Sequence, residues 1–116
     1  MALDRWDIIA VPSQLLGLPE DRPDPFGVVI SSTVTRDHAD RLWMLLIPNP
    51  GPKQNVYGDV PAPQLSRVIP ARPPVIRTST VFTVLRRDVG DQAIAQVSLD
   101  HQRQVLRFLD MFLPRR

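Results

Sequence analysis

Short apolar segments separated by polar or proline-rich stretches predict a mainly β protein. Residues 42–47 are apolar at every position, which is typical of a central strand buried on both faces. Residues 79–85 alternate β-branched and aromatic side chains and indicate a second strand. Residues 6–11 and 28–34 are further strand segments, and shorter ones are expected at 65–69, 75–77 and 93–97.

Prolines mark the connections between these segments. The chain has 13 prolines, concentrated at 12–25, 48–52, 61–63 and 70–74. Because proline interrupts both helix interiors and central strands, these stretches are expected to be loops, with 51–63 an irregular connection or an edge hairpin. No repeat or low-complexity linker divides the sequence, so residues 1–116 are predicted to form a single domain.

Only the C-terminal segment has the periodicity of a helix. Ser98 is a suitable N-cap, and Asp100 lies in the first turn, where the helix dipole favours an anion. The predicted apolar face is defined by Leu99, Gln102, Leu106, Leu109 and Leu113, widened by Val105, Phe108 and Phe112. About six strands followed by one helix predict a compact, partly open β-barrel.

Composition narrows the class of protein further. The 116 residues are 43% hydrophobic and include no cysteine, and no apolar run reaches the roughly 18–20 residues of a membrane span. The first residues lack the apolar core of a signal peptide, so we expect a cytoplasmic protein with no membrane partner. His38 and His101 show no metal-ligand spacing and no cofactor motif is present, so neither a metal nor a cofactor is expected. Arginine supplies nearly all of the positive charge, and the net charge of +2 permits a nucleic-acid partner without demanding one.

The order of the segments resembles a known family. The stretches "RWDIIAVP", "FGVVISS", "WMLLIPN", "PPVIRTSTVFTV" and "VSLDHQRQVLRFLDMFL" are similar in sequence order to the MazF/PemK/Kid-type toxins of type II toxin–antitoxin systems, in the CcdB/MazF-like superfamily. The resemblance implies a twisted SH3-like barrel with a C-terminal helix, acting as a homodimer. It also implies metal-independent cleavage of single-stranded RNA that leaves a 2′,3′-cyclic phosphate, blocked by an antitoxin with a disordered tail.

The resemblance also implies catalytic positions, and both depart from the family pattern. In the family, an arginine-proline pair opens strand two and a threonine ends strand three. Here strict register puts Pro25 and Phe26 at the first position, so Arg22, in the Arg22-Pro23 pair, becomes the candidate phosphate-binding cation. The alternative is a solvated loop arginine that pairs with Glu20 or Asp21. Asn49 stands near the threonine position; it can donate a hydrogen bond but cannot relay a proton, and its alternative role is that of a turn residue.

Other candidates complete the predicted site. Ser31 is a further catalytic candidate, although a serine at a strand end also commonly satisfies local backbone groups. Ser32, Lys53 and Arg77 are predicted to bind RNA, with a barrel-surface charge as the alternative for Arg77. Trp6 and Trp43 can stack on bases but are expected in the core, and Arg86-Arg87 is interpreted as a solvated basic pair.

Three functions remain open from the sequence. The first is an endoribonuclease toxin with an altered site. The second is a non-catalytic member of the fold that binds protein or RNA. A CcdB-like gyrase poison ranks last, because the W-G-I ending of that group is replaced here by Leu113-Pro114-Arg115-Arg116.

Overall fold

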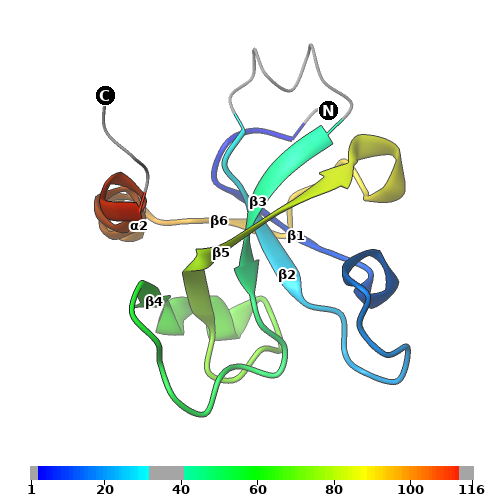
Figure 1. Cartoon of the computed structure of the whole chain (residues 1–116), viewed down its shortest axis with the longest axis horizontal. Coiled ribbons are helices and arrows are strands. Elements are labelled where there is room, and N and C mark those ends of the chain that lie inside the picture. Colours follow the sequence, from blue (N-terminus) through cyan, green and yellow to red (C-terminus); the bar gives the residue numbers. More distant parts are fainter. Residues whose placement is uncertain (1–2, 32–40, 113–116) are drawn as a thin grey trace.

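The structure is a computed structural model that describes residues 3–31 and 41–112. Six strands form one antiparallel sheet in the order β4-β5-β3-β2-β1-β6, with α2 on one side (Figure 1). The strands are β1 (Asp7–Ala10), β2 (Phe26–Val29), β3 (Arg41–Ile47), β4 (Asp59–Pro61), β5 (Val75–Leu85) and β6 (Ala95–Gln96). The helices are α2 (Leu99–Phe112) and the 3-10 turns η1 (Ser13–Leu16), η2 (Pro63–Arg67) and η3 (Arg86–Asp88).

Strand β3 lies inside the sheet, between β5 and β2, as its uninterrupted apolar sequence predicts. Leu42 and Met44 contribute to one buried cluster, whereas Leu45 and Ile47 contribute to a second one. Since successive side chains of a strand point to opposite faces, the sheet is buried on both sides. The mainly β, partly open barrel predicted from the sequence is confirmed, with β4 and β6 as its two edges.

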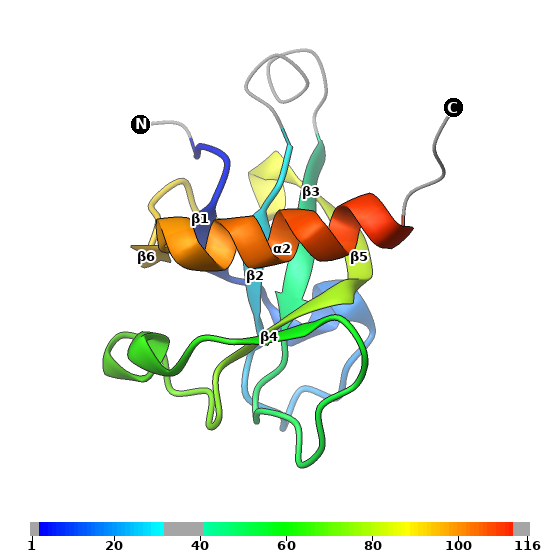
Figure 2. The ribbon, with the colours of Figure 1, turned by 90° about the vertical axis from the view of Figure 1, so that its left-hand side faces the viewer.

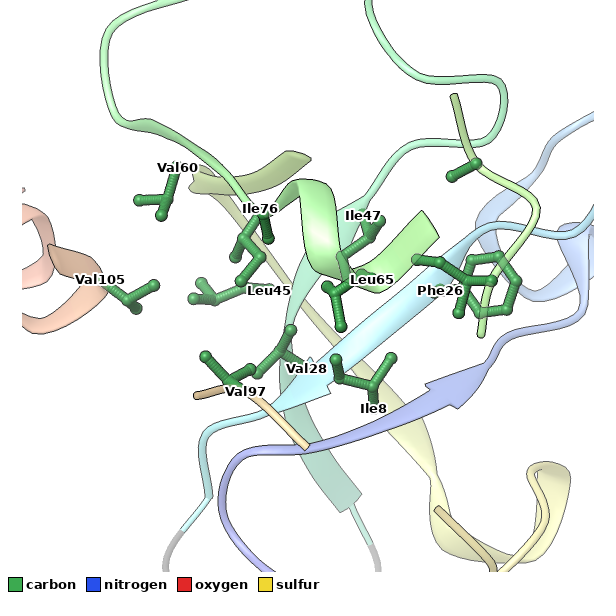
Figure 3. Packing of buried hydrophobic residues seen from close by; sticks show 13 residues of the cluster. Ile8, Phe26, Val28, Leu45, Ile47, Val60, Leu65, Ile76, Val97 and Val105 are labelled. Carbon is green, nitrogen blue, oxygen red and sulfur yellow. The ribbon is translucent and has the colours of Figure 1, made fainter. Parts of the chain in front are cut away.

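The cluster that contains Leu45 and Ile47, called the first cluster below, fills the concave side of the curled sheet, beneath α2. Val105 of α2 is fully buried there and faces Leu45 and Ile76 of the sheet (Figure 3). Helix α2 crosses this side of the strands (Figure 2). The second cluster, with Leu42 and Met44, covers the opposite face, where two leucines of η1 pack against it.

Strand β5 is one bent strand of 11 residues rather than the two strands predicted at 75–77 and 79–85. Its pairing with β3 jumps from Val81, opposite Leu45, to Arg77, opposite Leu46. Residues 78–80 are therefore extra relative to β3. This irregularity lets Ile76 join the first cluster while Val84 joins the second, and such bulges bend a sheet toward a barrel.

The prediction of a strand at 65–69 is wrong, because this segment lies mainly in the 3-10 helix η2. Pro63 occupies the start of η2, where its fixed φ suits a helical turn and its missing N–H costs nothing. Leu65 and Ile69, four positions apart, are both buried in the first cluster. The segment 51–63, predicted as irregular or an edge hairpin, contains the edge strand β4.

Helix α2 forms where it is predicted, but its buried face is rotated relative to the prediction. Val105 is at the centre of that face, whereas Leu99 and Leu106 are 61% and 50% exposed. The N-terminus agrees with the prediction, since the His101 N–H donates to Ser98 Oγ at 3.4 Å. Within the described residues no helix is long and apolar enough to cross a membrane.

Candidate functional site

The proline-rich loop before β2 and the segment after β3 meet at one end of the sheet. Phe26 pairs with Ile47, so residues before the first and after the second leave the sheet together. Asn49 Nδ2 donates to the Asp24 carbonyl oxygen at 2.9 Å, across 25 positions of sequence. The tertiary structure thus brings Asn49 against the loop that carries Arg22.

A second contact fastens this loop to η1. Ser13 is 4% exposed, and both its N–H and its hydroxyl donate to Asp24 Oδ1, at 2.9 and 3.0 Å. Closer to the sheet, the Val11 N–H donates to the Pro25 carbonyl at 2.9 Å. The Ser13–Asp24 and Asn49–Asp24 contacts, called the loop latch below, hold the loop at its β2 end.

Arg22 lies on the exposed part of this loop. Its N–H donates to the Pro19 carbonyl at 3.1 Å, which closes a turn. The structure gives its guanidinium no hydrogen bond or ion pair to another described residue, so the pairing with Glu20 or Asp21 is not observed. A guanidinium in this setting is accessible to an anion.

A hollow of about 380 Å³ opens between η1 and the loop that carries Arg22. It is lined by Pro12, Ser13, Gln14, Glu20 and Asp24. The Asp24 carboxylate serves the loop latch, whereas the Glu20 side chain is exposed. The sequence did not predict Gln14 and Glu20 as residues of the site, because only the fold places the first turn after β1 next to the loop.

Ser31 is not brought to this site. It lies beyond the far end of β2, where its buried hydroxyl accepts from the Trp43 N–H at 2.6 Å. The local backbone role is therefore the one that the structure supports for Ser31. Ser32 and His38 lie outside the described residues.

Trp43 is 48% exposed, so its predicted place in the core is wrong. Trp6, in contrast, packs against the first cluster. Trp43 and Val81, which is 45% exposed, are diagonal neighbours on β3 and β5, because Trp43 pairs with Thr83 and Leu45 with Val81.

Arg77 lies at the same end of the sheet as Asn49 and is held by a carboxylate. Its Nε and Nη2 donate to Asp59 Oδ1 and Oδ2, each at 3.0 Å. The Asp59 side chain is fully buried, and that of Arg77 is 22% exposed. Hydrogen bonding to Asp59 raises the pKa of Arg77 above its usual value, so this arginine remains charged. The pair fastens β4 to β5, a role that the sequence did not reveal.

Lys53 is exposed in the connection between β3 and β4. Gly51, in the same connection, lies directly against the backbone of Arg72 and Pro73. Among the described residues, no three histidine, aspartate or glutamate side chains are arranged to hold a metal ion.

Comparisons with known proteins identify the fold. A scan against protein-family models finds no match, and neither does a sequence search of curated proteins. Solved structures do match. An endoribonuclease in complex with its cognate antitoxin from Mycobacterial species is 10% identical with a TM-score of 0.67, over 97% of this chain and 100% of that one.

Two further solved structures also match this chain over most of its length. The MazE-MazF crystal structure from Deinococcus radiodurans gives a TM-score of 0.70 at 10% identity, over 96% and 94% of the two chains. Mycobacterium tuberculosis toxin MazF-mt6 gives 0.63 at 14% identity, over 87% and 89%. Identities this low establish the shared architecture rather than shared chemistry. Over nearly its whole length, the chain has the fold of the MazF endoribonucleases.

Proposed function

We propose that this protein is the toxin of a toxin–antitoxin pair, a metal-independent endoribonuclease acting on single-stranded RNA. The observation that carries the proposal is the contact of Asn49 with the loop that carries Arg22, at one end of a MazF-type fold. The matched structures, which include an endoribonuclease bound to its antitoxin, support it at the level of architecture. The Asn49–Asp24 contact at 2.9 Å supplies the geometry.

The proposed chemistry is internal attack of a 2′-hydroxyl on the adjacent phosphate. The Arg22 guanidinium binds the non-bridging oxygens and stabilises the charge that develops on the phosphorane. Asn49 uses one amide N–H on Asp24, and its second N–H is available to the same phosphate. Glu20, whose carboxylate lines the hollow beside the loop, is the candidate acceptor of the 2′-hydroxyl proton. The P–O5′ bond breaks as the P–O2′ bond forms, and the leaving 5′ oxygen takes a proton from water. The products are a 2′,3′-cyclic phosphate and a 5′-hydroxyl.

The same proposal includes the partners. Apolar side chains exposed on the sheet and on α2, among them Trp43, Val81 and Leu106, support a homodimer, because large exposed apolar areas mark association surfaces. An antitoxin with a disordered tail would cover the RNA site and neutralise the toxin. The proposal keeps Lys53 and Arg77 as RNA-binding residues. Arg77 would contact RNA through the guanidinium N–H groups that do not bind Asp59. With RNA and an antitoxin as the proposed partners, the proposed location is the cytoplasm.

The test is cleavage of mixed-sequence RNA by the purified protein in the presence of EDTA. Wild type is expected to produce fragments with cyclic phosphate ends, and Arg22→Ala is expected to reduce the rate at least a hundredfold. Arg103→Ala, which removes an exposed arginine from α2, is the matched control and should cleave at the wild-type rate. Full activity of Arg22→Ala would contradict the assignment of Arg22. Sedimentation at micromolar concentration tests the dimer, which a monomer would refute.

A second candidate function is RNA binding without cleavage. The observation in its favour is that Asn49, which stands near the family's threonine position, already donates to the Asp24 carbonyl oxygen. An amide cannot relay a proton, so this position can hold RNA without assisting cleavage. Tight RNA binding by wild type with no fragments after prolonged incubation would favour this function over the nuclease.

A further inference from the structure

A second hollow, of about 370 Å³, lies at the other end of the β3–β5 pair from Asn49. Its apolar lining comes from Leu85, which is partly exposed, and from Leu3 and Leu42, which are buried beneath it. Its rim is polar and includes Arg86 and Arg87 of η3, together with Asp91. The proposed nuclease site does not use this hollow, so its cationic rim needs an explanation of its own.

The two arginines are presented for contact with an anion. Both lie in the single turn of η3, immediately after β5, and both are exposed. The structure gives neither guanidinium a hydrogen bond or ion pair to another described residue. Asp91 already has an interaction of its own. A planar guanidinium matches the geometry of phosphate oxygens and can bind two of them at once.

The apolar lining restricts the class of ligand. A bare inorganic anion gains nothing from the partly exposed Leu85 side chain, whereas a nucleotide unit has both a charged and an apolar part. Its base or ribose can cover Leu85 while its phosphate meets the guanidinium groups. The hollow therefore suits one nucleotide of a strand.

The hollow lies on the same face of the sheet as the loop latch. Leu15 and Leu16 of η1 and Val89, which follows η3, pack against the same buried cluster. Figure 1 shows η1, in blue, and η3, in yellow, on the side of the sheet away from α2. Leu42 and Ile47 are five positions apart on β3, which is about 17 Å of strand. At about 3.4 Å per stacked nucleotide, this distance corresponds to roughly five nucleotides.

We propose that the Arg86–Arg87 hollow is a second phosphate subsite for the RNA strand whose scissile phosphate lies at Arg22. The inference rests on the proposed function for the identity of the strand. It adds a contact several nucleotides from the cleaved bond, which sets the length of RNA bound. Single-stranded RNA is favoured over an acidic peptide because the two sites lie on the same face of the sheet, at a spacing that a few nucleotides of one strand can span.

The test compares binding of short and long uncleavable RNA. Mixed-sequence 2′-O-methyl oligonucleotides of about three and about ten nucleotides are used, since only the longer spans both sites at about 3.4 Å per nucleotide. Arg86→Ala with Arg87→Ala should weaken binding of the longer RNA about tenfold or more. Its slope of log affinity against log salt should fall by about 0.7 for each phosphate that the variant no longer neutralises. Binding of the shorter RNA should not change, and Arg103→Ala should bind both as wild type.

A second variant tests the same hollow without truncating Arg86 and Arg87. A Cβ at Gly90 would meet no atom within 4 Å, and Gly90 lines the hollow. Gly90→Glu therefore adds a carboxylate with both arginines in place and should weaken binding of the longer RNA, whereas Gly90→Ala should not.

Each outcome decides between the possibilities. Unchanged affinity and salt slope for the longer RNA, in both the double arginine variant and Gly90→Glu, would overturn the proposed subsite, even if wild type cleaves RNA. Loss of binding to a glutamate decamer, with RNA binding unchanged, would overturn it in favour of an acidic peptide. The expected binding pattern in a protein that never cleaves RNA would support the subsite and refute the nuclease. A wild type that binds neither RNA would overturn both proposals.

Discussion

The clamp between Asp59 and Arg77 offers the sharpest test of how the curled sheet is held. Asp59→Asn keeps the shape of the side chain and removes its charge. The fully buried Asp59 carboxylate accepts two bonds from Arg77 at 3.0 Å, and its Oδ2 also accepts from the Val56 N–H at 2.9 Å. The substitution therefore weakens three hydrogen bonds, two of which join β4 to the bent strand β5.

The magnitude follows from the burial of each partner. Breaking a buried ion pair costs about 3–5 kcal/mol, because one charge is left without a partner. The Arg77 side chain is 22% exposed, so water can solvate part of its charge, and the asparagine can still accept one bond. We therefore expect a loss of about 2–3 kcal/mol in the free energy of unfolding.

Urea unfolding measures this loss directly. With a slope of about 1–3 kcal/mol/M, the midpoint should fall by about 1–2 M while the slope stays constant. Asp21→Asn, at an exposed loop carboxylate, is the control and should not shift the midpoint. Combining Asp59→Asn with Arg77→Met should give a coupling energy of about 1–2 kcal/mol. A loss below about 0.5 kcal/mol for Asp59→Asn, which is the level of a surface pair, would refute the reasoning.

Three further perturbations test other parts of the structure. Val105→Ala, at the fully buried centre of the α2 face, should cost about 2 kcal/mol in a thermal or urea melt, and no change would contradict that placement. Gly51→Ala should destabilise the fold, because its Cβ would collide with backbone atoms of Pro73, which cannot rotate away as a side chain can. A wild-type melting temperature for this variant would contradict the close packing of Gly51 against Pro73. Ser13→Ala and Asp24→Asn should each weaken the Ser13–Asp24 contacts of the loop latch, raising protease cleavage within residues 17–25 and lowering the RNA cleavage rate with little change in the urea midpoint. Unchanged proteolysis in both would mean that the latch does not order the loop.

The candidate site was only partly predictable from the sequence. Arg22 and Asn49 could be singled out by the family resemblance, and the structure brings their segments together. Ser31 lies apart from these two residues, since the β2–β3 pairing places it beside Trp43, at the far end of the strand. The hollow between η1 and the loop could not be predicted, because Gln14 and Glu20 belong to different turns that only the fold makes neighbours.

The sequence by itself determined the features that depend on near neighbours. Alternating or continuous apolar residues specified β1, β3 and most of β5, because a side-chain period of two follows from the strand backbone alone. A period near 3.6, with Ser98 as the cap, specified α2 in the same way. Prolines marked the loops, because the restriction that they impose is also local.

Tertiary structure decided what depends on partners distant in sequence. The bend in β5 follows from its register against β3, and the buried face of α2 follows from where Val105 meets the sheet. Trp43 is exposed although its whole segment is apolar, since α2 and the neighbouring elements do not fully cover its position. Apolar periodicity states that a face can be buried, whereas only the packing of the complete chain determines which faces find a partner.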